Sequence, residues 1–262
     1  MLILNLFQYF SINNTKMKQT KKQHKAITVP SPEERVREKI KICGMKYPDN
    51  ITQVAALQPD YLGFIFYEKS LRNFDAKSIP DIPNTIKKVG VFVNTTIDFV
   101  IEKIHTHHLQ AVQLHGEETP EYCSTLRTRY AKTISASYYK SPKKHQNPKN
   151  LELIKVFSIK NEFNFEVLKP YENKVNYFLF DTKGKLPGGN GYTFNWDVLN
   201  NYPSTKPFFL SGGIGINEIE NIKKFLQSKV SAYCYAIDVN SKFETAPGLK
   251  KIDDLKIFKN EL

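Results

Sequence analysis

Cysteine, tryptophan and methionine are scarce in this chain of 262 residues, which contains three Cys, one Trp and three Met. The spacing of Cys43, Cys123 and Cys234 matches no zinc-binding pattern, and an odd number argues against a disulfide framework. Sparse unpaired cysteines are typical of a reducing compartment, so we expect a cytoplasmic protein. We interpret Cys123 and Cys234 as small core residues.

Long apolar runs are also missing. No segment approaches the ~20 apolar residues that a membrane-spanning helix needs, so we expect no membrane partner. Residues 1–10 are apolar, but no positive residue precedes them and no small-residue cleavage site follows, which argues against a signal peptide. We expect residues 1–37 to form a disordered N-terminal extension, with Met17 as an alternative start, and residues 38–262 to form one domain.

Acidic residues are fewer than basic ones, 26 against 38, which leaves a net charge of +12. The first 30 residues hold five lysines and no acid, and the rest of the excess is spread thinly. The exception is the lysine-rich run Lys140-Ser-Pro-Lys143-Lys144-His145 in an expected loop. We therefore expect no nucleic-acid partner, although a basic binding module built on the tail and this loop stays an alternative.

From residue 38 onward, strand-like runs alternate with segments of helical spacing. The expected strands are Lys39–Cys43, Tyr61–Phe66, Lys88–Val93, Ala111–His115, Leu153–Ser158, Asn176–Asp181, Pro207–Ser211 and Ala232–Val239. The expected helices are Pro48–Leu57, Thr96–His107, Pro120–Tyr130, Phe163–Tyr171, Asn195–Asn200, Asn217–Leu226 and Ile252–Asn260, with at most a turn of helix in Phe74–Asn84. This alternation predicts an α/β fold, a single (β/α)8 TIM barrel, with a doubly wound open sheet as the alternative.

Several local features of the sequence also carry predictions. No GxGxxG follows the first strand, which disfavours a dinucleotide-binding fold. Thr96 and Asn217 are expected helix N-caps. We expect Thr133–Tyr139 to form an extra strand and Lys140–Asn150 to be an exposed insertion. His105, His107 and His108 are expected on a helix surface.

Alternation along the strands places one polar set on the lumen side. Lys41, Cys43, Gln113, His115, Asp181 and Asp238 all fall on that face. Since the carboxyl ends of barrel strands form the active face, we expect this set inside the barrel or at its mouth, where Gln113, His115 and Asp238 would bind substrate. A thiol at Cys43 and a carboxyl at Asp181 suit proton transfer, and the Lys41 ammonium on the same face could favour the thiolate.

Two glycine-containing or small-residue turns suggest phosphate binding. Phe208–Gly215 reads as an apolar strand, a glycine turn and a helix start, which offers backbone N–H groups to an anion. Ala236–Ser241 ends the last strand with small polar residues. We expect Gly212, Gly213, Ile214, Asn240 and Ser241 to hold a phosphate. Gly188–Gly191, with nearby Lys183 and Lys185, is interpreted as a flexible active-site loop, with a solvated connector as the alternative.

An ordered set of motifs carries a family resemblance. They are Lys41-Ile-Cys-Gly-Met45, Gly63-Phe-Ile-Phe66 with Ser70-Leu-Arg72, Val89–Asn94, Val112-Gln-Leu-His-Gly116, Phe180-Asp-Thr182, Gly188-Gly-Asn-Gly191, Leu210–Gly215, Asp238-Val-Asn-Ser241 with Glu244, and Pro247-Gly-Leu-Lys250. The region from about residue 38 to 262 resembles the phosphoribosylanthranilate isomerase family of tryptophan biosynthesis.

The resemblance implies an Amadori rearrangement without metal or organic cofactor, on a small phosphosugar substrate, by a monomer or homodimer. It implies Cys43 as general base, Asp181 as general acid and Arg72 as the group that holds the anthranilate carboxylate. Lys242 and Leu71 stand where the family often carries Gly and Pro. An indole-glycerol-phosphate synthase-like lyase is the alternative enzyme, but it would favour catalytic lysine and glutamate at the strand ends.

Overall fold

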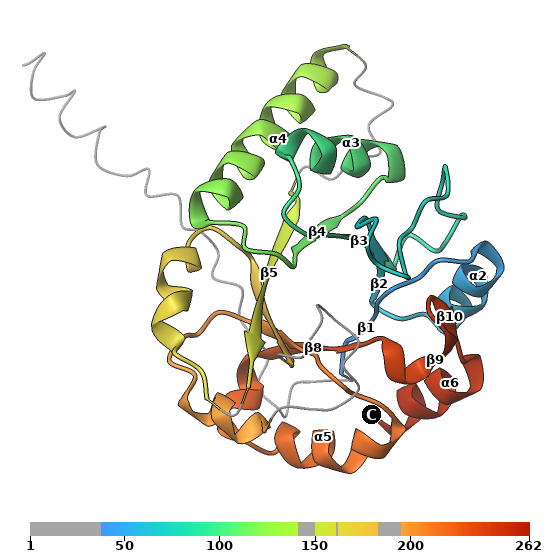
Figure 1. Cartoon of the computed structure of the whole chain (residues 1–262), viewed down its shortest axis with the longest axis vertical. Coiled ribbons are helices and arrows are strands. Elements are labelled where there is room, and N and C mark those ends of the chain that lie inside the picture. Colours follow the sequence, from blue (N-terminus) through green and yellow to red (C-terminus); the bar gives the residue numbers. More distant parts are fainter. Residues whose placement is uncertain (1–37, 141–149, 161, 183–194) are drawn as a thin grey trace, which may run out of the picture.

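Eight parallel strands form a closed barrel (Figure 1) in the computed structural model, which describes residues 38–140, 150–160, 162–182 and 195–262. Each strand pairs with the next along the chain, and β8 pairs with β1 to close the ring. The strands are β1 Ile40–Ile42, β2 Tyr61–Ile65, β3 Lys87–Phe92, β4 Ala111–Leu114, β5 Glu152–Ile159, β6 Tyr177–Thr182, β7 Phe208–Leu210 and β8 Cys234–Val239. The predicted (β/α)8 barrel and all eight predicted strands are confirmed.

Helices surround the barrel, and several of them are short 3₁₀ turns. The α-helices are α2 Pro48–Ala56, α3 Ile97–His107, α4 Pro120–Lys140, α5 Ile219–Leu226 and α6 Ile252–Glu261. The 3₁₀ helices are η2 Phe165–Tyr171, η3 Trp196–Asn201, η4 Ile216–Glu218, η5 Lys229–Tyr233 and η6 Ser241–Phe243. A small hairpin, β9 Glu244–Ala246 and β10 Leu249–Lys250, follows β8. Residues 66–86, all described, contain turns but no helix.

Two local predictions are wrong. Thr133–Tyr139 lies within α4 and is not an extra strand. β4 and β5 already pair with each other, so a strand between them in the chain would find no free edge in a closed ring.

Asn217 lies inside η4 and caps nothing, because α5 starts only at Ile219. Thr96 does cap α3, since its side chain accepts a hydrogen bond from Phe99 N. Most of the predicted 140–150 insertion, residues 141–149, lies outside the described residues.

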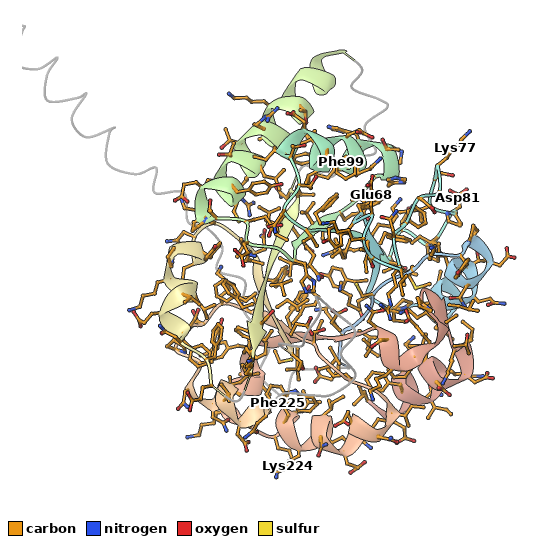
Figure 2. The ribbon with its side chains drawn as sticks, in the orientation of Figure 1. Glu68, Lys77, Asp81, Phe99, Lys224 and Phe225 are labelled. Carbon is orange, nitrogen blue, oxygen red and sulfur yellow. The ribbon has the colours of Figure 1, made fainter. Side chains whose placement is uncertain are left out.

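The apolar core has two layers, one between the strands and the helices and one inside the barrel. Helix α5 shows how the outer layer forms, because Ile219, Ile222 and Phe225 are buried at helical spacing. Lys224 projects outward from the same helix (Figure 2). Cys123 and Cys234 are buried in this outer layer, as predicted.

His107 corrects a third prediction, since it is buried and does not lie on the helix surface. It continues the buried stripe of α3, three residues after Ile104. Its ring stacks on Phe66 with centroids 5.1 Å apart. Burial lowers the pKa of His107, so the neutral imidazole is the form that fits among these aromatic rings.

The amino end of the barrel is filled by a tyrosine floor, formed by Tyr61, Tyr177 and Tyr235 around Phe209. The Tyr61 hydroxyl lies 3.2 Å from Glu152 Oε2 and 3.3 Å from the Tyr235 hydroxyl. The lumen is therefore packed at this end, and polar side chains collect at the other. Within the described part of the chain, no helix has both the length and the apolar character to cross a bilayer.

Candidate active site

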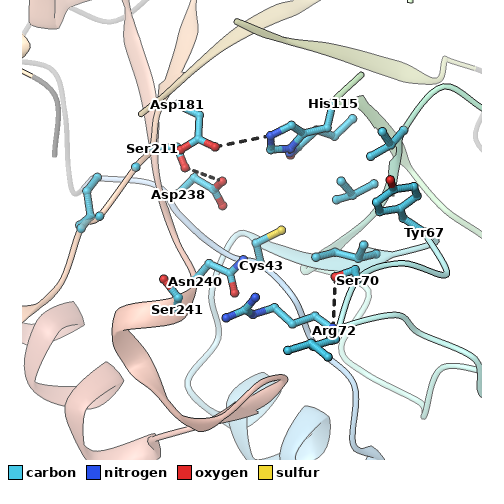
Figure 3. Close-up of a pocket in the computed structure, with 18 of the residues that line it drawn as sticks. Cys43, Tyr67, Ser70, Arg72, His115, Asp181, Ser211, Asp238, Asn240 and Ser241 are labelled. Atoms are coloured by element: carbon cyan, nitrogen blue, oxygen red, sulfur yellow. Dashed lines mark hydrogen bonds and ion pairs between the residues drawn. The ribbon is translucent and has the colours of Figure 1, made fainter. Parts of the chain in front are cut away.

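A pocket of about 370 Å³ opens at the carboxyl ends of the strands (Figure 3). Every site residue predicted from the sequence lines it: Cys43, Arg72, Gln113, His115, Asp181, Gly212, Gly213, Ile214, Asp238, Asn240 and Ser241. The sequence did not single out the apolar wall formed by Ile65, Tyr67, Leu71, Val91 and Val93. These side chains carry no chemical signature, so only the fold brings them to one wall.

Cys43 sits at the tip of β1, where the chain leaves the barrel. Its N–H donates to Val239 O at 2.9 Å, which extends the β1–β8 ladder by one residue, and Gly44 then turns with φ of +75°. The neighbouring strand makes room for the sulfur through Gly63, because a Cβ there would lie 2.7 Å from Sγ. The thiol thus faces the pocket beside Gly63, where any larger residue would collide with the sulfur.

The protonation of this thiol differs in part from the prediction. Burial raises the pKa of Cys43, and the Lys41 ammonium opposes that rise without reversing it. The predicted direction of the lysine's effect is therefore right, but the free protein favours the neutral thiol. The reason is that the free energy lost when a buried thiolate gives up its hydration exceeds the free energy gained from its attraction to one nearby ammonium.

Lys41 and Asp238 form an ion pair beneath Cys43. Parallel pairing sets Lys41 beside Asp238 in register, so their side chains share the lumen face. Nζ lies 2.7 Å from Asp238 Oδ1, and Ser211 Oγ donates to Asp238 Oδ2 at 3.1 Å. Burial alone would lower the pKa of Lys41, but the charge of Asp238 raises it, so the lysine stays protonated.

Asp181 ends β6 on the far side of the pocket, where Figure 3 shows it facing His115. Its Oδ1 accepts from Thr182 N at 2.9 Å, and its Oδ2 lies 3.5 Å from His115 Nε2. Gln113 Nε2 lies 3.2 Å from His115 Nδ1. An amide nitrogen can only donate, so in this arrangement His115 carries its proton on Nε2, toward Asp181.

Gln113 also presents an unmatched acceptor to this end of the pocket. Its side chain is buried, and its Oε1 has no hydrogen-bond partner among the described residues. A buried carbonyl oxygen without a donor costs about 1–3 kcal/mol. A ligand hydroxyl or N–H would satisfy it, which fits the predicted substrate-binding role.

Arg72 enters the pocket from the segment after β2 and is held by Glu244. The guanidinium Nη2 lies 2.7 Å from Glu244 Oε2, and Nε donates to both carboxylate oxygens at 2.9 and 3.0 Å. Burial alone would raise the pKa of Glu244, but the hydrogen bonds from Arg72 and the charge of Lys250 hold it below its usual value. In the sequence Glu244 and Lys250 stand out only as parts of the family motifs, because no local pattern links Arg72 to Glu244 across 172 residues.

The two predicted phosphate loops meet at one edge of the pocket. Gly212 and Gly213 have φ of +95° and +68°, a conformation that L side chains rarely adopt. The tight turn brings Gly212 against β6, where a Cβ would lie 2.2 Å from Thr182 Oγ1. Asn240 and Ser241 follow β8 at the same edge. The loop interpretation of Gly188–Gly191, with Lys183 and Lys185, falls outside the described residues.

Together these features define a (β/α)8-barrel enzyme with its site at the carboxyl ends of the strands. The family model for N-(5′-phosphoribosyl)anthranilate isomerase matches residues 40–147 and 140–261. The chain therefore belongs to the N-(5′-phosphoribosyl)anthranilate isomerase family, and it is an isomerase of tryptophan biosynthesis.

Named relatives agree with this assignment. The chain is 42% identical over 224 residues to the N-(5′-phosphoribosyl)anthranilate isomerase of Parabacteroides distasonis, covering 84% of this chain and 90% of the relative. It is 36% identical to that of Phocaeicola vulgatus, covering 85% and 97%. The crystal structure of the Thermotoga maritima isomerase aligns with a TM-score of 0.66 at 28% identity, covering 86% and 98%.

Another solved structure of the family carries a bound ligand. It is a phosphoribosylanthranilate isomerase in complex with reduced 1-(o-carboxyphenylamino)-1-deoxyribulose 5-phosphate, with a TM-score of 0.63 at 25% identity, covering 86% of this chain and 97% of that one. The family assignment favours the isomerase over the lyase that the sequence left open.

Proposed function

We propose that this chain converts N-(5′-phosphoribosyl)anthranilate into 1-(2-carboxyphenylamino)-1-deoxyribulose 5-phosphate, with Cys43 as general base and Asp181 as general acid. The observation that carries the proposal is a thiol on β1 and a carboxyl on β6 that face one pocket. An Amadori rearrangement needs one proton delivered to the ring oxygen and one removed from C2, so it needs two groups on different sides of the sugar.

In the first step protonated Asp181 would give its proton to the furanose oxygen as the C1–O bond breaks. The nitrogen lone pair forms the C1=N bond, and the product is an open-chain iminium with a free C4 hydroxyl. The Nε2–H of His115, 3.5 Å from Asp181 Oδ2, is placed to stabilise the carboxylate left behind.

In the second step the Cys43 thiolate would take the C2 proton. The C2–H electrons form the C1=C2 bond and the C=N electrons return to nitrogen, which yields an enolamine that tautomerises to the ketone. Atoms and electrons balance without an external oxidant or reductant. The iminium cation beside the sulfur would add to the Lys41 charge and favour the thiolate when substrate is bound.

The substrate has two anionic ends, and the pocket offers a separate site for each. Glu244 occupies Nε and Nη2 of Arg72, which leaves Nη1 as the donor for the anthranilate carboxylate. The phosphate would lie against Gly212–Ile214, where Gly212 and Gly213 have positive φ angles, and against Asn240–Ser241. Gln113 Oε1 and Asp238 would contact the sugar hydroxyls between them.

The proposed activity needs no cofactor, nucleic acid or membrane partner, and we propose a monomer or homodimer that acts in the cytoplasm. The Thermotoga maritima relative has been described as dimeric. Cys43, Cys123 and Cys234 are all free thiols, which supports a reducing compartment.

Complementation of a tryptophan-requiring strain that lacks this step tests the proposal, together with purified turnover followed by loss of aminal fluorescence. We expect the wild-type chain to restore growth, and Cys43→Ser to lower kcat about 10²–10⁴-fold with unchanged circular dichroism. Cys234→Ala, a buried cysteine behind the sheet, is the matched control and should keep its turnover. Near-normal turnover of Cys43→Ser would reject the role of this thiol.

A further inference from the structure

The Pro247–Lys250 motif ends in a lysine whose ammonium is buried against three acceptors. Lys250 Nζ lies 2.7 Å from Asn240 Oδ1, 3.2 Å from Asn240 O and 2.7 Å from Glu244 Oε1. Its side chain is completely buried. An ammonium group has three N–H donors, so each one has an acceptor here.

The backbone of Lys250 is fixed as firmly as its side chain. Asn50 of α2 accepts from Lys250 N at 2.8 Å and donates to Lys250 O at 2.9 Å. Both residues are buried, so this pair of hydrogen bonds ties β10 to the helix that follows β1. The ammonium therefore has a defined position relative to the barrel.

The acceptors of Lys250 belong to the two proposed anion sites, one residue in each. Asn240 lies in the phosphate loop, and Figure 3 shows it close to Arg72 on one side of Cys43. Glu244 grips Arg72, the proposed carboxylate site, with three hydrogen bonds. One buried ammonium is thus the common neighbour of both anion sites.

We propose that Lys250 is a positioning residue that holds the phosphate loop and Arg72 in their binding geometry at the same time. This inference rests on the proposed function, because it assigns the two arms to the two anionic ends of that substrate. Lys250 contacts neither reacting atom, so it acts through Asn240 and Glu244. Neutralising or removing the ammonium therefore weakens both ends of the site together.

The charge state of Lys250 gives this role a pH dependence. Burial lowers its pKa to about 8, while Glu244 and Cys43 oppose that fall and Arg72 adds to it. A neutral amine has two N–H donors for three acceptors and no charge, so above this pH Lys250 loses its ion pair with Glu244 and at least one of the three hydrogen bonds. A lysine that served only to fill space would not couple anion binding to its protonation.

Two separate probes test the coupling, namely inorganic sulfate for the phosphate end and anthranilate for the carboxylate end. We expect Lys250→Met to weaken binding of each probe about tenfold or more, measured by calorimetry or NMR titration. Glu244→Gln should weaken anthranilate alone by a similar factor. Lys206→Met is the matched control, because Lys206 is a desolvated lysine bound to Val175 O at the amino end of the barrel.

Sulfate remains a dianion from pH 7 to 9.5, so it also reports on Lys250 in the wild-type protein. Its affinity should fall as pH rises through about 8, and the fall should be absent in Lys250→Met. Unchanged binding of both probes in Lys250→Met, or the same fall in both proteins, would overturn the inference. If Lys250→Met does not fold, wild-type sulfate binding that is flat from pH 7 to 9.5 overturns it instead.

Failure of the proposed function gives a different pattern. In that case the wild-type chain would not turn over the aminal at all, whatever the probes do. A wild-type chain that is active, but whose two probe affinities are unaffected by loss of Lys250, would reject the positioning role alone.

Discussion

Lys41 and Asp238 form a buried ion pair, 2.7 Å from nitrogen to oxygen, directly across the β1–β8 ladder and two residues before Cys43. Neither side chain has more than 5% of its surface exposed. A pair at this depth contributes little net stability, since both charges have lost their water. It is costly to break, however, because the surviving partner stays buried and unpaired.

Removal of one partner should therefore destabilise the fold more than removal of both. We expect Lys41→Met to lower the free energy of unfolding by about 3–5 kcal/mol, and the Lys41→Met/Asp238→Asn double variant to lose less than Lys41→Met alone. Urea unfolding of the four proteins gives the coupling energy. Strict additivity would mean that the two groups do not interact as a charged pair.

The reactivity of Cys43 should report its raised pKa. A free thiol has a pKa near 8.5, so its alkylation is already appreciable at neutral pH. Burial raises the pKa of Cys43, and the neutral thiol of the folded protein should react slowly with iodoacetamide until the pH passes well above that ordinary value. Peptide mass spectrometry identifies the labelled residue.

The Lys41 variant extends this measurement. The Lys41 ammonium favours the thiolate, so Lys41→Met should shift the rise of the alkylation rate to still higher pH. Labelling in the presence of anthranilate is the control for accessibility, because a ligand in the pocket should protect the thiol from iodoacetamide. A half-maximal rate near or below pH 8.5 in the free wild-type protein would contradict the assigned direction.

Gly63 should prove irreplaceable for a steric reason specific to the site. An added Cβ would lie 2.7 Å from Cys43 Sγ and 3.1 Å from Cys43 Cα, so Gly63→Ala must displace the thiol. We expect a stability loss of about 1–3 kcal/mol and a fall in kcat of about 100-fold. Stopped-flow turnover and thermal unfolding measure the two effects.

Gly90→Ala is the matched control for that substitution. Its Cβ would meet Leu109 and Phe92 at 2.6 and 2.7 Å in the outer core, behind the sheet. It should cost comparable stability but leave the kcat of the folded fraction within a few-fold of wild type. Equal falls in kcat for the two variants would show that the effect is a general loosening of the barrel.

Glu118 offers a fourth test, on the turn that follows His115. Its buried carboxylate accepts from Asn94 N at 2.8 Å and Gly116 N at 3.0 Å, and it pairs with the Lys155 ammonium at 3.2 Å. Glu118→Gln removes the charge and should cost about 1.5–3 kcal/mol, because hydrogen bonds to charged groups are the stronger ones. Thermal unfolding is the measurement, and an unchanged midpoint would contradict it.

The barrel itself could be predicted because each strand is recognisable from a short stretch of sequence, and because eight strands alternating with helical segments indicate this fold. Cys43, Asp181 and the two phosphate loops could be placed at the mouth for the same reason, since they follow predicted strands directly. The partner of Arg72 could not, because 172 residues separate it from Glu244 and only three-dimensional closure joins them. Lys250 lies only 10 and 6 residues from Asn240 and Glu244, but no sequence pattern shows that its side chain is buried against them.

The wrong predictions have causes in tertiary packing. Thr133–Tyr139 contains residues that favour strands, but a closed ring has no edge left for another strand, and α4 continues through the segment. His107 is polar, yet it falls in register with the apolar stripe of α3 and is buried by it. In both places tertiary packing outweighs what the individual residue types favour.

The tyrosine floor separates the amino end of the barrel, which contributes to stability, from the carboxyl end, which holds the pocket. Since Tyr61, Tyr177 and Tyr235 fill the lumen below the pocket, the described residues leave the pocket open at the carboxyl ends of the strands, and the proposed chemistry places no requirement on the amino end. Substitutions in the floor should move the melting temperature while sparing turnover, whereas substitutions of the side chains that line the pocket should mainly lower turnover. Residues that line the pocket can therefore change substrate specificity without lowering the stability of the barrel.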